Sequence, residues 1–298
     1  MTNINPRVDL AFKKIFGVEE NKDLLIYLIN SIVGEEDQVS EVTLLNLYNP
    51  KKFNSDKLSI LDIKATNQDG KKFNIEIQIS DEADYDKRAL YYWAKIYTEQ
   101  LKESDDYSKL SKAIGIHILN FTSIPDVEKY HNVFHITEKE TGMTYFRDME
   151  LHTIELKKFS NNSQDVLSDI VAKVKNSLDI WVAFLTRNYL LQPNNLPKSL
   201  NQPALKKALN VLDRMNFTKE ERSEYEDHLK WLRIETNTLK KAKEDGVKEG
   251  IEKGIEQGRE EAVEKTAINM LKQNLGNDLI STVTGLSNNQ ILKLKNEL

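Results

Sequence analysis

Two neighbouring segments with strict alternation of polar and apolar residues constrain the fold of this 298-residue chain more than any other feature. Residues 61–79 read LDIKATNQDGKKFNIEIQI, and in each half every second residue is apolar. This period of two is typical of strands that bury one face. The polar side chains predicted to share the other face are Asp62, Lys64, Asn74, Glu76 and Gln78.

The turn between the two segments predicts their register. A three-residue loop at 68–70, with Gly70 in the left-handed position, is a common hairpin connection. It pairs Asn67 with Lys71 and places Asp62 directly opposite Glu76. A loop one residue shorter or longer would turn Asp62 towards an isoleucine, because a one-residue slip moves every side chain to the other face. The alternation therefore selects the three-residue loop.

Two opposed carboxylates on a sheet predict a binding site for a divalent cation. Their Cβ atoms would lie about 5 Å apart, and without a cation one carboxyl group would take up a proton. Magnesium prefers a few carboxylates, a carbonyl oxygen and retained waters. Asp62, Glu76 and the backbone carbonyl of Ile77 could supply that set. The alternative is an ordinary amphipathic hairpin with its polar face in water.

The rest of the chain predicts a mixed α/β region followed by helices. The run AIGIHILNF at 113–121 is almost continuously apolar and indicates a strand buried on both faces. After Phe159 the pattern is almost wholly helical. The other predicted elements are helices at 8–33 and 83–103, strands at 42–48, 58–66 and 72–80, and weaker strands at 132–137, 143–148 and 151–157.

The last third of the chain predicts a long, highly charged helix. Glycines recur at 246, 250, 254 and 258, and each costs roughly 1 kcal/mol relative to alanine in a helix. We interpret this segment as a solvated stalk or a close helix–helix contact. Two short helices, 277–284 and 287–297, follow and are interpreted as a helical hairpin for self-association.

Composition excludes several classes of protein. The 42 basic and 47 acidic residues give a net charge of −5, so the chain is not a generally cationic nucleic-acid binder. It has no cysteine, which excludes thiolate metal sites and a cysteine nucleophile. No segment approaches the ~20 apolar residues of a membrane span, and no signal peptide is visible. We expect a cytoplasmic protein that does not contact membranes.

The order of motifs resembles the Rpn family of recombination-promoting nucleases, which carry the PD-(D/E)XK nuclease core. The pattern Asp-x(13)-Glu-x-Gln on the hairpin is the central match. The other similar segments are DLAFKKIFG (9–17), LLIYLINSIVG (24–34), RALYYWAKIYTEQL (88–101), IGIHILNF (114–121), ELKKF (155–159), the glycine repeat and TGLSNNQILKL (284–294).

This resemblance implies a restriction-endonuclease-like αβββαβ core that cleaves DNA with Mg²⁺, or with Mn²⁺ or Ca²⁺ in its place. Asp62 and Glu76 would bind the metal, and Gln78 stands where the wider superfamily usually has lysine. Glutamine cannot supply positive charge to the transition state. The candidates for that charge are Lys64, Lys13 and Arg88.

Further residues are candidates for DNA contact. Lys71 and Lys72 belong to a locally basic stretch, although lysines also commonly guard hairpin edges. Asp9 could approach the site from the first helix, or serve as an N-cap or first-turn partner of the helix dipole. His131 and His135 have the spacing of a helical zinc pair, but their segment reads as a strand, so we expect them to be structural.

We therefore expect an α/β nuclease core at 1–160, a helical region at 161–240 and a tail at 241–298. The predicted function is metal-dependent DNA endonuclease activity that promotes recombination or acts around mobile DNA, in a homo-oligomer held by the C-terminal helices. The alternative is a catalytically weak or inactive DNA-binding or interaction module of the same fold. A third interpretation is a structural oligomer driven by the tail.

Overall fold

The computed structural model describes residues 4–46, 63–79, 81, 84–160 and 164–297. The chain forms two compact units, residues 1–232 and residues 233–298. The predicted boundaries at 160 and 240 stay predictions. Within the described residues, no helix combines the length and apolar character needed to cross a membrane.

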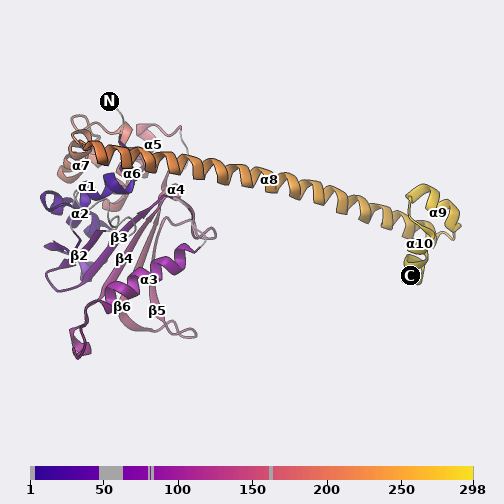
Figure 1. Ribbon diagram of the computed structural model, residues 1–298, viewed down its shortest axis with the longest axis horizontal. Coiled ribbons are helices and arrows are strands. Elements are labelled where there is room, and N and C mark those ends of the chain that lie inside the picture. The colour runs from indigo at the N-terminus through magenta and orange to yellow at the C-terminus, as the bar shows by residue number, and fades with distance from the viewer. Residues whose placement is uncertain (1–3, 47–62, 80, 82–83, 161–163, 298) are drawn as a thin grey trace. The chain divides into compact units, whose positions relative to one another are not determined.

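Six strands of the described chain form one mixed sheet in the order β1-β2-β3-β4-β6-β5 (Figure 1). The neighbours β3, β4 and β6 run parallel, whereas β1–β2, β2–β3 and β5–β6 are antiparallel pairs. The strands are β1 Val42–Leu44, β2 Ile63–Asn67, β3 Lys72–Gln78, β4 Ala113–Leu119, β5 His131–Thr137 and β6 Thr144–Glu155.

The predicted hairpin register is confirmed over the residues that the structure describes. Ile63 pairs with Ile75, and Lys64 pairs with Asn74. The loop adopts the predicted form, with Gly70 at φ 82°. The Asn67 side-chain oxygen accepts the backbone N–H of Lys71 at 2.8 Å, which closes the turn. Asp62 lies outside the described residues.

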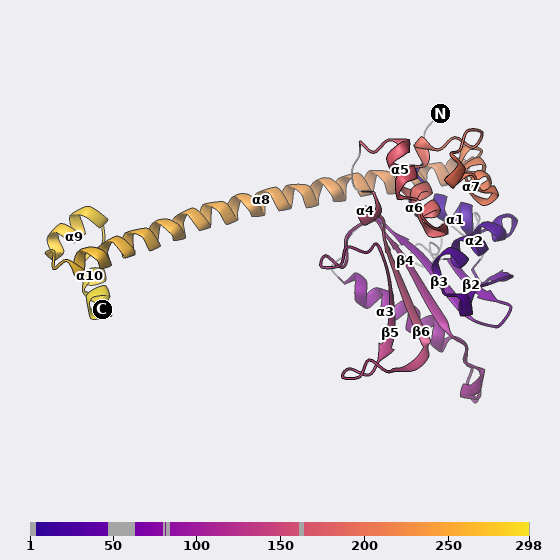
Figure 2. The same cartoon turned by 180° about the vertical axis from the view of Figure 1, so that it is seen from behind.

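One face of the sheet packs against helices α1, α2, α6 and α7 (Figure 2). Alternate residues of β3 and β4, such as Ile75 and Ile116, are fully buried between sheet and helices. These helices are α1 Asp9–Phe16, α2 Lys22–Ile32, α6 Ser177–Arg187 and α7 Pro203–Asp213. The helices after residue 160 therefore share the core of the sheet.

The other face of the sheet is crossed by α3, Tyr85–Thr98 (Figure 1). Tyr85 and Ala89 pack against Leu119 of β4 and against Phe121. The indole N–H of Trp93 donates a hydrogen bond of 2.7 Å to the carbonyl oxygen of Ala113 in β4. Because partners in register point to the same side of a sheet, the polar face of β3 is the face that α3 covers.

The structure corrects one of the predicted strand assignments. Two strands were expected at 143–148 and 151–157, but β6 is continuous from Thr144 to Glu155. Glu150 lies within this continuous strand, where Lys112 and His152 pair with its carboxylate. The prediction that β4 is buried on both faces is confirmed along its whole length.

The remaining short elements connect these layers. They are α4 Leu156–Phe159, α5 Leu167–Lys173 and the 3₁₀ turns η1 Glu19–Asn21, η2 Glu35–Asp37, η4 Tyr107–Lys109, η5 Asn188–Leu190 and η6 Lys198–Leu200.

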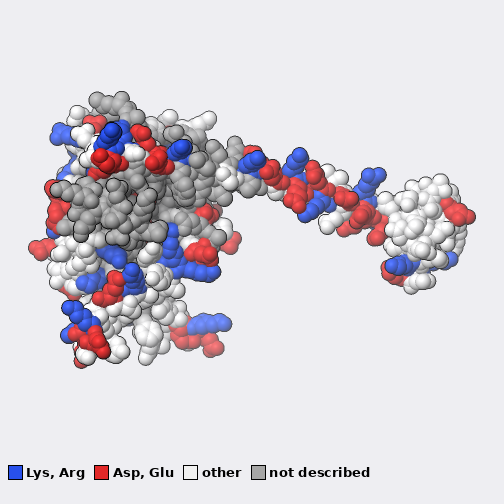
Figure 3. All heavy atoms as spheres, viewed as in Figure 1, with Lys and Arg blue, Asp and Glu red and all other residues white. Residues whose placement is uncertain are grey.

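The long helix α8 extends from Lys219 to Lys272 and carries interspersed acidic and basic side chains (Figure 3). It is followed by α9, Asn277–Thr284, and α10, Asn288–Asn296, which confirms both predicted helices. Within the second unit Ala267, Ile280 and Ile291 form a small buried cluster. The two short helices therefore fold against the end of α8.

We predict that Gly70→Ala destabilises the first unit by about 1 to 2 kcal/mol, the usual cost of a left-handed conformation for a residue with a Cβ. The added Cβ would also meet the Ser111 hydroxyl oxygen at 3.2 Å. Urea unfolding followed by circular dichroism measures this change.

Gly142→Ala is the matched control, since Gly142 also has a positive φ but no neighbouring atom within 4 Å of the added Cβ. Gly142→Ala should lose only the free energy that a positive φ costs a residue with a Cβ, with no added steric contact. Unchanged stability of Gly70→Ala would contradict the role of this turn.

Candidate active site

Arg88 joins the two polar residues of β3 that the sequence singled out. Its Nη2 donates one hydrogen bond of 2.9 Å to Glu76 Oε1 and another of 2.7 Å to Gln78 Oε1. Glu76 is only 7 % exposed. The two acceptors are two residues apart in a strand and so share one face. Arg88 returns to them because α3 begins only seven residues after the end of β3.

Burial of the Glu76 carboxylate makes this contact energetically important. An ionised carboxylate taken out of water needs a partner charge or several hydrogen bonds. The Arg88 guanidinium supplies the partner charge and one hydrogen bond, and its own side chain is 29 % exposed. The guanidinium also lies over the ring of Tyr85, with its central carbon 5.1 Å from the ring centre. This cation–π contact fixes the orientation of the guanidinium plane.

His117 and Tyr85 form a second layer beneath this ion pair. The Tyr85 hydroxyl lies 2.8 Å from His117 Nδ1, and this nitrogen is 3.8 Å from Glu76 Oε2. Burial, followed by the charges of Arg88 and His152, lowers the pKa of His117 to about 4. The imidazole is therefore neutral at pH 7, and of these groups it is Arg88 that brings a positive charge to Glu76.

The sequence contains a signal for His117 that the alternation of the hairpin does not reveal. A single histidine interrupts the apolar run AIGIHILNF, two residues after Gly115. A Cβ on Gly115 would come within 2.6 Å of Leu151 Cδ2 and 3.0 Å of His117 Nε2, so the glycine admits both side chains. Tyr85 gave no such signal, because its role depends on the position of α3 over β4.

Asn74 is a further buried polar residue on the same face. It is 1 % exposed, it pairs in register with Lys64 and Gly115, and its side-chain amide has no hydrogen-bond partner among the described residues. Buried polar groups of this kind normally bind a protein group or an ordered water. The sequence placed Asn74 on the polar face but gave it no role.

The other predicted site residues lie at different distances from this centre. Lys64 shares the face of Glu76, but its Nζ is 3.7 Å from Glu99 at the end of α3. Ile77 is 4 % exposed and its side chain belongs to the core on the opposite face. Asp62 lies outside the described residues, so the structure does not place it relative to Glu76.

Asp9 and Lys13, the two predicted site residues on α1, differ in their position on the helix and in their surroundings. Asp9 is the first residue of the helix, where a carboxylate interacts favourably with the helix dipole. Lys13, one turn later, is only 2 % exposed. A Cβ placed on Gly17 would touch both Lys13 Cγ, at 2.9 Å, and Ile63 Cγ1, at 3.2 Å. The stem of Lys13 therefore lies beside the first described residue of β2.

Lys71 and Lys72, predicted to contact DNA, have protein partners. Lys71 Nζ lies 2.7 Å from Asp37, which is 1 % exposed, and donates to the carbonyl oxygen of Glu36. Lys72 Nζ donates to the Thr66 hydroxyl at 3.2 Å. Contact of either lysine with a phosphate stays a prediction.

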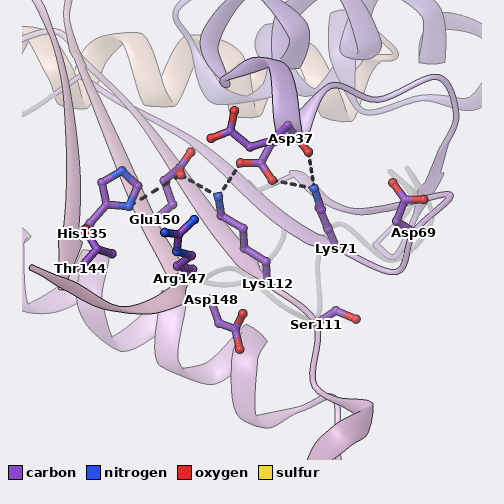
Figure 4. A pocket seen from close by; sticks show the side chains of 11 residues that line it. Asp37, Asp69, Lys71, Ser111, Lys112, His135, Thr144, Arg147, Asp148 and Glu150 are labelled. Atoms are coloured by element: carbon purple, nitrogen blue, oxygen red, sulfur yellow. Dashed lines mark hydrogen bonds and ion pairs between the residues drawn. The ribbon is translucent and has the colours of Figure 1, made fainter. Parts of the chain in front are cut away.

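A cavity of about 610 Å³ lies next to Lys71 (Figure 4). Lys112 pairs there with both Asp37 and Glu150. Burial raises the pKa of Glu150, but the hydrogen bonds from His152 and Lys112 outweigh it and lower the pKa to about 2. Glu150 pairs in register with Ile114 and so faces the helical core, opposite to Glu76. This cavity is thus separate from the site around Glu76.

His131 and His135 lie in strand β5, which confirms that their segment is a strand and not a helix. His131 Nε2 lies 3.0 Å from His152 Nδ1, and His152 Nε2 lies 2.6 Å from Glu150 Oε1. Burial, and then the charges of His152 and Lys129, lower the pKa of His131 to about 4.

In the described part of the chain, no three His, Asp or Glu side chains converge on a common metal position.

We predict that the first unit loses stability as the pH falls from 6.5 towards 4. The unfolded chain protonates His117 near pH 6.5, whereas the folded protein does so only near pH 4. The unfolded state therefore binds more protons in this window, and stability rises with pH. A shift of this size corresponds to roughly 3 kcal/mol for one buried histidine.

Urea unfolding at several pH values checks this expectation. His117→Gln should reduce the decline between pH 6.5 and 4 by about half, because His131, whose pKa is also lowered to about 4, contributes the rest. His135→Gln, at an exposed position of β5, should leave the decline unchanged. An equal decline in wild type and His117→Gln would rule out His117 as its source.

Comparison with known proteins places the chain in a family. The sequence matches the model of one family, described as PD-(D/E)XK nuclease family transposase, over residues 6–242. No curated protein and no solved structure matches the chain. The match covers well over half of the chain and agrees with the resemblance carried by its motifs. The protein therefore belongs to the PD-(D/E)XK nuclease family of transposases.

Proposed function

We propose that this protein is a metal-dependent DNA endonuclease with its active site on the face of β3 that α3 covers. The observation that carries the proposal is the bridge from the Arg88 guanidinium to Glu76 and Gln78. It brings together a buried carboxylate, an amide oxygen and a partly exposed cation on one face of the sheet. Membership of a nuclease family supports DNA as the substrate.

Arg88 is our candidate for the positive charge that Gln78 cannot supply. A guanidinium recognises phosphate oxygens through paired N–H donors and stays charged at any pH the protein experiences. Gln78 accepts a hydrogen bond from Arg88 and thereby positions it. Of the other cations considered, Lys64 is directed towards Glu99. Lys13 is buried beside Ile63.

The donor atoms present fit a hard divalent cation. Glu76 offers a carboxylate and Ile77 a backbone carbonyl oxygen, and oxygen donors are the ligands preferred by Mg²⁺, Mn²⁺ and Ca²⁺. We propose Asp62 as the second carboxylate, since the register that would place it opposite Glu76 holds from Ile63 onward. The bound cation would lower the pKa of a water molecule and reduce the charge of the scissile phosphate.

His117 and Tyr85 would act as positioning residues. A neutral imidazole held by the tyrosine hydroxyl leaves Arg88 as the cation paired with Glu76. Its Nδ1 lies 3.8 Å from Glu76 Oε2, so the imidazole packs beside the carboxylate.

The first test is plasmid cleavage in the presence of Mg²⁺, Mn²⁺, Ca²⁺ or EDTA. Wild-type protein should nick or cut DNA with a divalent cation and not with EDTA. Asp62→Ala and Glu76→Ala should both reduce cleavage to background, because each removes a proposed metal ligand. Circular dichroism establishes that both variants are folded.

Cleavage that survives both substitutions would place the active site elsewhere or reveal a contaminating nuclease. A wild-type protein that binds DNA but cleaves it with none of these cations would favour the alternative function, a DNA-binding module of the same fold. The glutamine at position 78, where the wider superfamily usually has lysine, is the observation that supports this alternative. A steep loss of binding with added salt would then identify phosphate contacts as its basis.

The role of Arg88 gives a separate prediction. Arg88→Ala should lower the cleavage rate by about 10²- to 10³-fold, as loss of one transition-state donor does in other enzymes. Gln78→Lys combined with Arg88→Ala should recover part of that loss, because the lysine restores a cation at the strand position. Single-turnover cleavage of a short duplex measures both rates.

The matched control is Lys87→Ala, the preceding residue on α3, whose side chain is 77 % exposed and paired with Asp84. It should cleave at the wild-type rate. An Arg88→Ala enzyme as fast as Lys87→Ala would eliminate Arg88 from the reaction.

We further propose a cytoplasmic role around recombining or mobile DNA, and self-association through the C-terminal helices. The second proposal is supported by Val247, Ile251 and Ile255, which lie four residues apart on α8 and are 54–67 % exposed. Glycines follow the same period, which would allow a second helix to approach closely.

A further inference from the structure

The outer edge of β5 lacks the features that normally protect a sheet edge. β5 is the last strand of the sheet, and no described strand pairs with its outer side. Its sequence, HNVFHIT, contains no lysine, arginine, acidic residue or proline. Edge strands of monomeric proteins are usually guarded by charges, proline or a bulge, because unpaired N–H and C=O groups recruit another strand.

The irregular pairing between β5 and β6 does not interrupt this edge. Phe134 pairs with Leu151 and Ile136 pairs with Phe146. An advance of two residues along β5 therefore corresponds to five residues along β6. The extra residues of the bulge therefore belong to β6, the inner strand. β5 keeps an uninterrupted outer edge over its seven residues.

Apolar side chains are exposed along the same hairpin. Val133, Phe134 and Ile136 of β5 are 39–44 % exposed. Met143, Tyr145 and Phe146, which lie just before or within β6, are 55–68 % exposed. Because successive residues of a strand point to opposite faces, these side chains expose apolar surface on both faces beside the edge. Exposed apolar surface that is larger than scattered single residues usually marks an interface. The absence of lysine and arginine from β5 argues against a nucleic-acid partner, whose phosphates require cations.

We propose that β5 pairs antiparallel with β5 of a second copy of this chain, which joins the two sheets into one. Antiparallel pairing of identical strands is two-fold symmetric, so one strand satisfies both sides of the interface. Because β5 has no lysine, arginine or acidic residue, two copies of it can pair without repulsion between like charges. A charged partner would have no opposite charge to bind on β5. This inference does not depend on nuclease activity and uses a surface different from the C-terminal helices.

The exposed side chains supply a substantial part of such an interface. An aromatic residue can bury roughly 150–250 Å², so the exposed parts of Phe134, Tyr145 and Phe146 amount to roughly 300 Å². The three exposed aliphatic side chains and the newly paired backbone of β5 add to this area. A standard interface buries about 800 Å² per partner, so the pairing places this contact towards the small end of stable interfaces.

The absence of cysteine from the chain makes a direct test possible. In a two-fold antiparallel pair one position lies opposite itself, with Cβ atoms about 4.5–5.5 Å apart, close to disulfide distance. Single cysteines are introduced at 132 to 136 in the full-length protein, oxidised and separated on non-reducing gels. Disulfide-linked dimer should peak at one position and fall at its neighbours.

Leu90→Cys, at a 49 % exposed position of α3, measures collisional cross-linking, including any caused by tail association. Cross-linking that is equal at all five β5 positions and at Leu90→Cys would overturn the proposal. A peak at one position identifies the residue on the symmetry axis.

A second measurement does not depend on disulfide geometry. In a background that carries Ile251→Lys and Ile255→Lys, which removes association through α8 from all three proteins compared, Phe134→Lys combined with Ile136→Lys places two charges in the proposed interface. The mass measured by light scattering should then fall to about half. Tyr107→Lys, at an 81 % exposed aromatic position, should keep the wild-type mass. Equal masses for all three folded proteins, or a monomeric wild type, would refute β5 pairing.

Discussion

The register of the β2–β3 hairpin is the constraint on which the rest of the site depends. Gly70 in the left-handed conformation and the Asn67 side chain close a three-residue loop. The loop turns the polar residues of β3 towards α3 and the isoleucines towards the helical core. A shift of one residue would bury Glu76 among α1, α2 and α6 without a counter-ion, at a cost of several kcal/mol. Core packing and site geometry therefore select the same register.

The two faces of the sheet hold their buried carboxylates in different ways. On the helical face Glu150 is neutralised by Lys112, and Asp37 pairs with both Lys112 and Lys71. These charges balance within the protein, as expected of a structural network. On the α3 face Glu76 is paired with the partly exposed Arg88. A cation that reaches solvent can also meet a phosphate, which is why we assign the chemistry to this face.

Sequence reasoning succeeded where the controlling interactions are local. The hairpin loop, the run of β4 and the helices that begin at Asn277 and Asn288 depend on residues close in the chain, and each was predicted. It failed at β6, which is one strand and not two; its residue Glu150 is held by Lys112, which is 38 residues away. The contact of Tyr85 with His117 was missed for the same reason, since it depends on how α3 packs on β4.

Because residue 78 is glutamine and not the usual lysine, its side chain brings no positive charge to the site. A lysine at position 78 would bring its own charge, whereas Gln78 contributes an oxygen that positions a charge from α3. The same guanidinium is the counter-ion of Glu76, so Glu76 remains paired before any substrate or cation binds. A metal cation bound to Glu76 would weaken the ion pair between Glu76 and Arg88, because the metal and the guanidinium would compete for the same carboxylate. The guanidinium would then be freer to bind a phosphate, which couples occupation of the carboxylate to recognition of the substrate.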